Sequence, residues 1–259
     1  MKKLAAALVA PLLLVGCATP TQPAATPPPS NASQSITGEV TVFAAASLTE
    51  TFTQIGKDFQ AANPGTKVKF NFGGSSALAQ QIDQGAPADV FASASPTNMK
   101  QVTDTGAATG PVTFVRNKLQ IAVGKGNPLK IASLADLVKP EVKLALCAEQ
   151  VPCGAAAKKA FEAAKLTPKP VTLEQDVKAT LTKVRLGEVD AALVYKTDVS
   201  AAANDVDGVD FPEAAQAIND YPIVTLTKAP NATGAKAFMD YVLSPAGRDV
   251  LTKAGFDVP

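Results

Sequence analysis

Segments typical of strands alternate with segments typical of helices along most of the chain, and this alternation limits the fold more than any other feature. A strand is predicted over 39–44, followed by a helix over 47–62 whose apolar residues recur at helical spacing. Alternating apolar residues predict a second strand over 68–72. A helix over 75–84 and a strand over 88–91 continue the series. Because strands joined through helices usually run parallel, the sequence predicts an α/β fold of mainly parallel sheets with helices on both faces.

The second half of the chain repeats the pattern and predicts two lobes. A long strand over 116–123 could leave one lobe and enter the other, and residues 221–226 could form the return crossing. The predicted lobes are therefore 39–117 plus 222–259, and 118–221. Two lobes joined by two crossings enclose a cleft, and clefts between domains are favoured ligand sites. The other predicted elements are a strand over 143–147, helices over 154–165 and 177–186, a strand over 190–195, and two final helices over 233–243 and 245–254 that pack on the first lobe.

The first residues have the pattern of a targeting signal. Lys2 and Lys3 precede an apolar stretch over 4–15, which is too short to span a bilayer but has the proportions of a signal-peptide core. The stretch ends in Leu-Val-Gly-Cys, which resembles the bacterial lipobox, so Cys17 is predicted to carry a lipid; a plain signal peptide with an incidental cysteine is the alternative. Residues 18–38 are rich in Pro, Thr, Ser and Ala and are predicted to form a tether. These features predict a lipoprotein held outside the cell membrane.

The composition excludes several classes of function. The net charge is +1, with no basic stripe and no acidic tail, so nucleic acid is not an expected partner. The chain contains no histidine, which excludes the usual catalytic triads and zinc sites built on imidazole. Cys147 and Cys153 are predicted to form a structural disulfide, because an exported protein meets an oxidising environment; a reactive dithiol is the alternative.

Four of the predicted helices begin with groups that can donate hydrogen bonds. These starts are marked by Ser47, by Gly74 with Ser75, by Pro152 with Cys153, and by Asp176 with Val177. Each helix start offers unsatisfied N–H groups and the positive end of a dipole, so several starts that share a cleft could bind an anion without a positive side chain. Each residue also has a purely structural explanation. Ser47 with Glu50 has the spacing of a capping box, Asp176 can be a simple cap, the glycines can form a turn, and Tyr195 can be a core tyrosine.

Several motifs resemble those of the periplasmic molybdate-binding proteins. The motifs are VFAAASL at 42–48, GSSALAQQI at 74–82, GAPADVF at 85–91, VPCG at 151–154, LVYKTD at 193–198 and FMDYV at 238–242. They occur in one order, and the resemblance covers residues 39–257.

The resemblance implies a type II periplasmic-binding fold with two lobes that close on a hinge. It also implies a solute-binding protein that captures molybdate for an ABC transporter permease. Carried over by position, the ligand would be held by the hydroxyl and backbone donors of Ser47 and Ser75, the backbone N–H groups of Cys153 and Val177, and the hydroxyl of Tyr195.

The sequence departs from the family in ways that bear on the site. Cys153 stands where the family often has a small apolar residue, and a bond to Cys147 would leave its backbone donor available. Glu50 would be an unfavourable neighbour for a dianion unless it turns back into a capping box. Apart from Asp176, no acidic residue marks the matching helix starts, so we expect a tetrahedral oxoanion held by hydrogen bonds, with no cofactor and no directly coordinated metal.

Three alternatives stay open at this point: another cargo, an enzyme, and a purely adhesive or structural lipoprotein, against which a tight hinged cleft would argue. The cargo could be tungstate, which has nearly the size and charge of molybdate, or the smaller sulfate. An extracytoplasmic enzyme with Ser75 or Cys153 as nucleophile is disfavoured, because no base and no Gly-x-Ser-x-Gly elbow stands at a recognisable spacing. The expected partners are the ligand, the permease and, through the lipid, the membrane, and the protein is expected to be a monomer.

Overall fold

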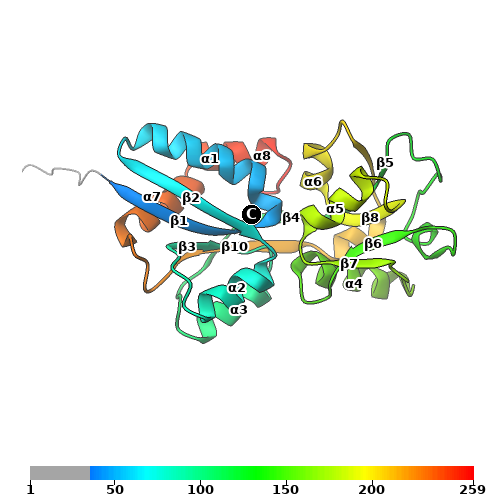
Figure 1. The fold of residues 1–259 in the computed structure, drawn as a ribbon, viewed down its shortest axis with the longest axis horizontal. Helices are drawn as coiled ribbons and strands as arrows, with labels where there is room; N and C mark the ends of the chain where they lie inside the picture. Colours follow the sequence, from blue (N-terminus) through cyan, green and yellow to red (C-terminus); the bar gives the residue numbers. More distant parts are fainter. Residues whose placement is uncertain (1–35) are drawn as a thin grey trace, which may run out of the picture. The chain divides into compact units, whose positions relative to one another are not determined.

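The computed structural model describes residues 36–259, which form two five-stranded sheets that lie side by side (Figure 1). The first sheet has the strand order β2 (Thr66–Gly73), β1 (Gly38–Ala45), β3 (Val90–Ala92), β10 (Asn219–Thr225) and β4 (Val112–Asn117). The second has the order β7 (Thr172–Glu174), β6 (Leu144–Cys147), β8 (Ala191–Tyr195), β5 (Leu119–Gly124) and β9 (Val206–Val209). The predicted signal peptide, its Cys17 and most of the predicted tether lie outside the described residues.

Each sheet is mainly parallel and contains one strand of opposite direction. In the first sheet β10 runs antiparallel to both of its neighbours, and in the second sheet β5 does so. The other pairings, β1 with β2 and β3, and β6 with β7 and β8, are parallel. The predicted α/β class is therefore confirmed, with mixed sheets.

The strands and helices form because their apolar residues fall on one face. Val40, Val42 and Ala44 alternate along β1 and are completely buried. Helix α1 (Thr49–Ala62) covers them with Phe52 and Ile55, which are also completely buried. Burial of a side chain of this size stabilises the folded state by about 1.5–3 kcal/mol.

Helices cover both faces of each sheet (Figure 1). On the first sheet α1 shares one face with α7 (Ala232–Leu243) and α8 (Pro245–Lys253), and their apolar residues belong to the larger apolar core, which continues into the second sheet. The opposite face carries α2 (Ser75–Asp83) and α3 (Pro96–Asp104), which enclose a separate, smaller apolar cluster. The second sheet is flanked by α4 (Pro152–Ala164), α5 (Val177–Arg185) and α6 (Lys196–Ala201).

Two segments connect the sheets. The strand predicted over 116–123 is in fact two strands, because β4 ends at Asn117 in the first sheet and β5 begins at Leu119 in the second. Strand β10 returns to the first sheet, where Asn219 pairs with Asn117. The residues that connect the sheets therefore lie next to each other.

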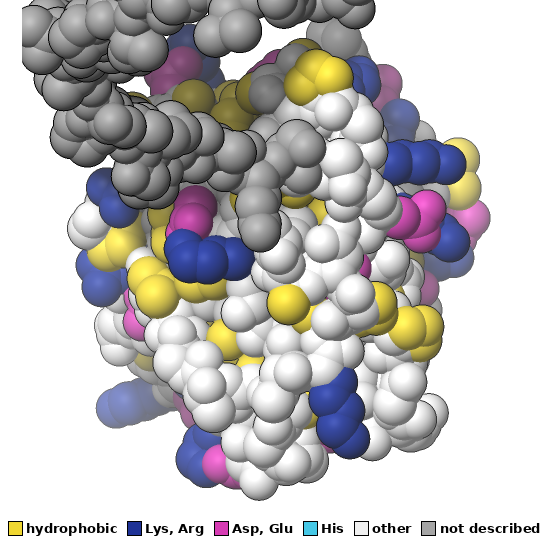
Figure 2. Space-filling view, turned by 90° about the vertical axis from the view of Figure 1, so that its left-hand side faces the viewer, with side chains coloured by type: hydrophobic (Ala, Val, Ile, Leu, Met, Phe, Trp, Pro, Cys, Tyr) yellow, Lys and Arg dark blue, Asp and Glu magenta, His cyan; other side chains and the backbone are white. Residues whose placement is uncertain are grey.

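The surface has no dominant charge. On the part of the face drawn in Figure 2 that is not covered by grey atoms, positive and negative side chains are interspersed. Within residues 36–259, no helix is both long enough and apolar enough to cross a membrane.

Candidate functional site

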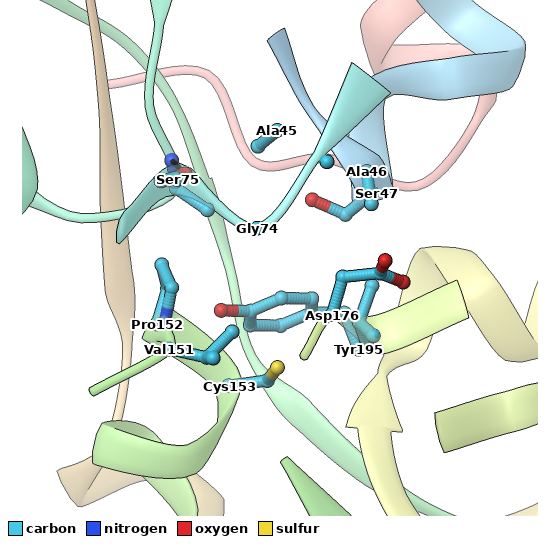
Figure 3. Close-up of a pocket in the computed structure, with 13 residues that line it drawn as sticks. Ala45, Ala46, Ser47, Gly74, Ser75, Val151, Pro152, Cys153, Asp176 and Tyr195 are labelled. Atoms are coloured by element: carbon cyan, nitrogen blue, oxygen red, sulfur yellow. Dashed lines mark hydrogen bonds between the residues drawn. The ribbon is translucent and has the colours of Figure 1, made fainter. Parts of the chain in front are cut away.

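A small, partly open cavity lies where the first and second sheets meet. Its lining comes from both sheets, and in Figure 3 the two groups of residues face one another across the cavity. The residues on the side of the first sheet are Ala45, Ala46, Ser47, Gly73, Gly74, Ser75 and Ala94. The residues on the side of the second sheet are Val151, Pro152, Cys153, Asp176, Val177 and Tyr195.

The five residues predicted to hold the ligand all line this cavity: Ser47, Ser75, Cys153, Val177 and Tyr195. They come from five different parts of the chain and from both sheets. Each of them is almost completely buried.

Helices α2, α4 and α5 begin at the cavity, and the beginnings of α2 and α4 have no side-chain cap. The N-caps of α2 and α4 are Gly74 and Val151, and neither accepts a hydrogen bond from the following turn through its side chain. At the third helix, α5, the Asp176 carboxylate accepts a hydrogen bond from the Ala179 N–H at 2.8 Å. The first-turn N–H groups of α2 and α4 are therefore available to a ligand, and the dipoles of all three helices favour a negative charge at this place.

The hydroxyl groups of the cavity each contact a polar group of the protein. The Ser47 hydroxyl lies 2.9 Å from the Tyr221 hydroxyl. The Ser75 Oγ accepts a hydrogen bond from the Ala94 N–H at 3.0 Å. The Tyr195 hydroxyl accepts one from the Asn219 side-chain amide at 2.9 Å.

Both buried tyrosines are neutral. Burial, together with the neighbouring Tyr221 and Asp198, raises the pKa of Tyr195 well above its usual value. Burial also raises the pKa of Tyr221, against the hydrogen bond with Ser47. Each phenol therefore keeps its proton and can act as a hydrogen-bond donor.

Among residues 36–259, no lysine or arginine side chain lines the cavity. Lys178 of α5 follows Val177 in the chain, and its Nζ lies 2.8 Å from Glu50 of α1 and 2.9 Å from Asp198 of α6. Asp198 is completely buried, and this burial raises the pKa of its carboxyl, although Lys178 acts in the opposite direction. Lys178 is thus held by carboxylates of the protein rather than directed at a ligand.

The capping box predicted for Ser47 and Glu50 is wrong. A short 3-10 turn, Ala46–Leu48, precedes α1, and the N-cap of α1 is Leu48, with no side-chain cap. The Ser47 hydroxyl bonds to Tyr221 instead, and the Glu50 carboxylate pairs with Lys178. The ion pair offsets the negative charge that made Glu50 an unfavourable neighbour for an anion.

Cys147 and Cys153 are joined by a disulfide bond, with Cα atoms 5.8 Å apart. The bond links the end of β6 to the first turn of α4, at the wall of the cavity. A bonded Cys153 has no free thiol to act as a nucleophile, but it keeps its backbone N–H.

Within residues 36–259, no group of three or more Asp, Glu or Cys side chains is arranged to hold a metal ion. The acidic residue in the lining, Asp176, already accepts a hydrogen bond from its own helix. The cavity therefore offers hydrogen-bond donors rather than metal ligands.

Sequence reasoning missed the residues that lie behind the cavity. Asn219 and Tyr221 lie on β10 and contact Tyr195 and Ser47, and the second of these contacts joins residues 174 positions apart. No local motif marks such a contact.

The sequence did mark the position of Gly74, because two glycines stand together at 73 and 74. A Cβ atom on Gly74 would lie 2.3 Å from the Gln175 carbonyl oxygen, across the cavity, so this position has room only for glycine.

Comparison with known proteins connects this architecture to a family. The family model described as bacterial extracellular solute-binding protein matches residues 40–257. The molybdate-binding protein ModA of Mycobacterium tuberculosis is 43% identical over 248 residues, which are 95% of this chain and 93% of the relative. A putative ABC transporter substrate-binding lipoprotein of Bacillus subtilis, YvgL, is 32% identical over 97% of this chain and 95% of its own length.

A solved structure shows the same fold. The periplasmic molybdate-binding protein of Azotobacter vinelandii superposes with a TM-score of 0.76 at 21% sequence identity. The match covers 85% of this chain and 99% of that protein. The type II periplasmic-binding fold that the sequence predicts is thereby confirmed.

Proposed function

Because this chain belongs to the family of bacterial extracellular solute-binding proteins, we propose that it captures molybdate outside the cytoplasm and delivers it to an ABC importer. One observation carries the proposal. The five residues that the resemblance to molybdate-binding proteins implies as ligands line one cavity whose donors are neutral. The names of the relatives, most of which are molybdate-binding proteins, support the same cargo.

The chemistry of the cavity suits a dianion. The hydroxyls of Ser47, Ser75 and Tyr195 and the N–H groups of Cys153 and Val177 would hold its oxygen atoms. A hydrogen bond to a charged group contributes about 1.5–3 kcal/mol, so a few such bonds are enough for binding in the micromolar range or tighter. The lobes predicted at 39–117 plus 222–259 and at 118–221 would close on the ion, and neutral donors would release it when they open.

Tungstate is the second candidate cargo, because its charge and size are nearly those of molybdate and hydrogen-bond donors cannot tell the two apart. Sulfate presents the same charge on a smaller tetrahedron. The enzyme alternative is not retained, since the family consists of binding proteins and Cys153 is held in a disulfide.

We also propose that Cys17 carries a lipid that anchors the protein to the outer side of the cell membrane. The lipobox at this position supports the anchor, and so does the similarity to YvgL, which is named a lipoprotein.

Calorimetric titration of the purified protein with molybdate, tungstate, sulfate and phosphate tests the cargo. We expect molybdate and tungstate to bind with similar affinity and phosphate to bind far more weakly, because phosphate carries a proton near neutral pH and the cavity has few acceptors for it. Absence of molybdate binding, or equal binding of phosphate, would overturn the proposal.

The same titration on serine variants tests the site. Ser47→Ala and Ser75→Ala each remove one donor, and we expect each to weaken molybdate binding by roughly 10- to 100-fold. Ser76→Ala is the matched control, since Ser76 is also buried at the start of α2 but does not line the cavity. If the control weakens binding as much as Ser75→Ala does, the site is assigned wrongly.

A further inference from the structure

The peptide groups of Ala94 contact two polar side chains, Ser75 in the cavity lining and Asn219 behind it. Its N–H donates to the Ser75 hydroxyl at 3.0 Å. Its carbonyl oxygen accepts from the Asn219 side-chain amide at 2.7 Å. Ala94 itself is almost completely buried, so these contacts are shielded from water.

The Ala94 carbonyl determines which way the Asn219 amide faces. A carbonyl oxygen can only accept a hydrogen bond, so the side-chain atom that Asn219 presents to it has to be the nitrogen. The same nitrogen lies 2.9 Å from the Tyr195 hydroxyl. Its two hydrogens are therefore both used, one on Ala94 and one on Tyr195.

This arrangement favours one role for the Tyr195 hydroxyl. Since its oxygen accepts from Asn219, its own hydrogen can be donated to an acceptor, either the neighbouring Tyr221 hydroxyl or a bound ligand. Burial keeps the phenol neutral, so that hydrogen stays in place. The Ser75 hydroxyl is in the same situation, because its oxygen accepts from the Ala94 N–H.

We infer that Asn219 is a positioning residue that fixes the Tyr195 hydroxyl as a donor and so selects fully deprotonated oxoanions over those that carry a hydrogen. The inference rests on the proposed function, because it concerns the same cavity. A protonated oxoanion needs an acceptor for its own hydrogen, and the Tyr195 oxygen is already engaged by Asn219. Without Asn219, the hydroxyl is free to rotate and to accept that hydrogen.

The test is a double-mutant cycle that joins Asn219→Ala to Tyr195→Phe, with molybdate binding measured by calorimetry. In the wild-type background we expect Asn219→Ala to weaken binding by about tenfold, since the donor is no longer oriented. In the Tyr195→Phe background, the same change should weaken binding less than about threefold, because the group it orients is gone. A purely structural role of Asn219 would give the same loss in both backgrounds.

Asn219→Asp is the second variant, and it keeps the size of the side chain. Its carboxylate accepts the Tyr195 hydrogen and takes the donor away from the ligand, so we expect a loss of roughly 10- to 100-fold. A second readout is selectivity. The ratio of phosphate to molybdate dissociation constants should fall in Asn219→Ala and stay unchanged in Ser76→Ala.

The outcomes separate the two proposals. Failure of the wild-type protein to bind molybdate would overturn the proposed function and this inference with it. Normal binding by the wild type, combined with an Asn219→Ala loss that persists in Tyr195→Phe, would overturn the inference alone.

Discussion

At the scale of single residues, a lysine beside the cavity lining is held by carboxylates of the protein rather than directed at a ligand. Lys178 contacts the exposed Glu50 and the completely buried Asp198. Asp198 in turn accepts a hydrogen bond from the Tyr195 backbone N–H. Removal of Lys178 would leave a buried carboxylate without its cation, directly behind a residue that lines the cavity.

We predict that Lys178→Met lowers the free energy of unfolding at pH 7 by on the order of 3 kcal/mol. The pKa of Asp198 is already raised by burial, and loss of Lys178, which lowers it, raises it further. A carboxyl group whose pKa is raised in the folded state lowers the free energy of unfolding at a pH where the group is ionised. It has no such effect once the group is protonated in both the folded and the unfolded state. The deficit should therefore be large at neutral pH and shrink as the pH falls toward the ordinary value of 3.8.

Urea unfolding at pH 7 and at about pH 4, followed by circular dichroism, measures this deficit. Glu50→Gln is the control, and it should change stability by less than about 1 kcal/mol because the carboxylate is exposed. A deficit that is equal at both pH values would show that Asp198 is not its cause.

At the scale of elements, the site consists of helix beginnings that approach one another closely. Gly74 at the start of α2 lies against Gln175, just before α5, although the two helices flank different sheets. Its backbone angles, φ −62° and ψ 130°, suit any residue. Glycine is therefore required at position 74 only because of the close approach to the Gln175 carbonyl oxygen. This approach exists only while the beginnings of α2 and α5 are close together.

We predict that Gly74→Ala weakens molybdate binding by about 5- to 150-fold, the equivalent of an overpacking cost of 1–3 kcal/mol. The melting temperature of the ligand-free protein should change little, because the two helix beginnings can move apart. Calorimetry and thermal unfolding measure the two effects. Gly73→Ala is the matched control, since its Cβ would meet nothing closer than Leu78 at 3.6 Å. Equal effects of the two variants would contradict the prediction.

Most elements could be predicted from the sequence, and the ones that were missed have weak patterns. Helix α3 was missed because only Asn98, Met99 and Val102 are buried along it, so its apolar stripe is thin. Its start does carry a local signal, since Ser95 caps the helix and a proline follows. Strand β7 is three residues long and half exposed, which leaves almost no periodicity to detect.

At the scale of the whole molecule, the two sheets have the same arrangement, although the sequence shows no repeat. In each sheet the fourth strand in spatial order is the antiparallel one, and this strand, β10 or β5, adjoins a connection between the sheets. Which strand reverses depends on contacts between distant segments, and a local pattern cannot reveal such contacts. For the same reason, the five residues expected to hold the ligand could be placed in one site from motifs, but Asn219 and Tyr221 could not.

We predict that the protein is found in the membrane fraction and that Cys17→Ser releases it in soluble form. The lipid supplies the hydrophobic anchor, and the tether predicted over 18–38 spans the distance to the folded part. Cell fractionation followed by immunoblotting distinguishes the two locations, and mass spectrometry of the first mature residue identifies the lipid. Cys17→Ser protein that is still processed and retained in the membrane would contradict the anchor.

The contacts of Ala94 set a limit on how this protein can be redesigned. The methyl group of Ala94 takes no part in its hydrogen bonds to Ser75 and Asn219, which use only main-chain atoms. Every amino acid supplies the same carbonyl, and every one except proline supplies the same N–H, so these two hydrogen bonds do not depend on which residue stands at position 94. Only a change in the course of the main chain could remove them, and a comparison of residue identities among relatives would overlook this contribution altogether.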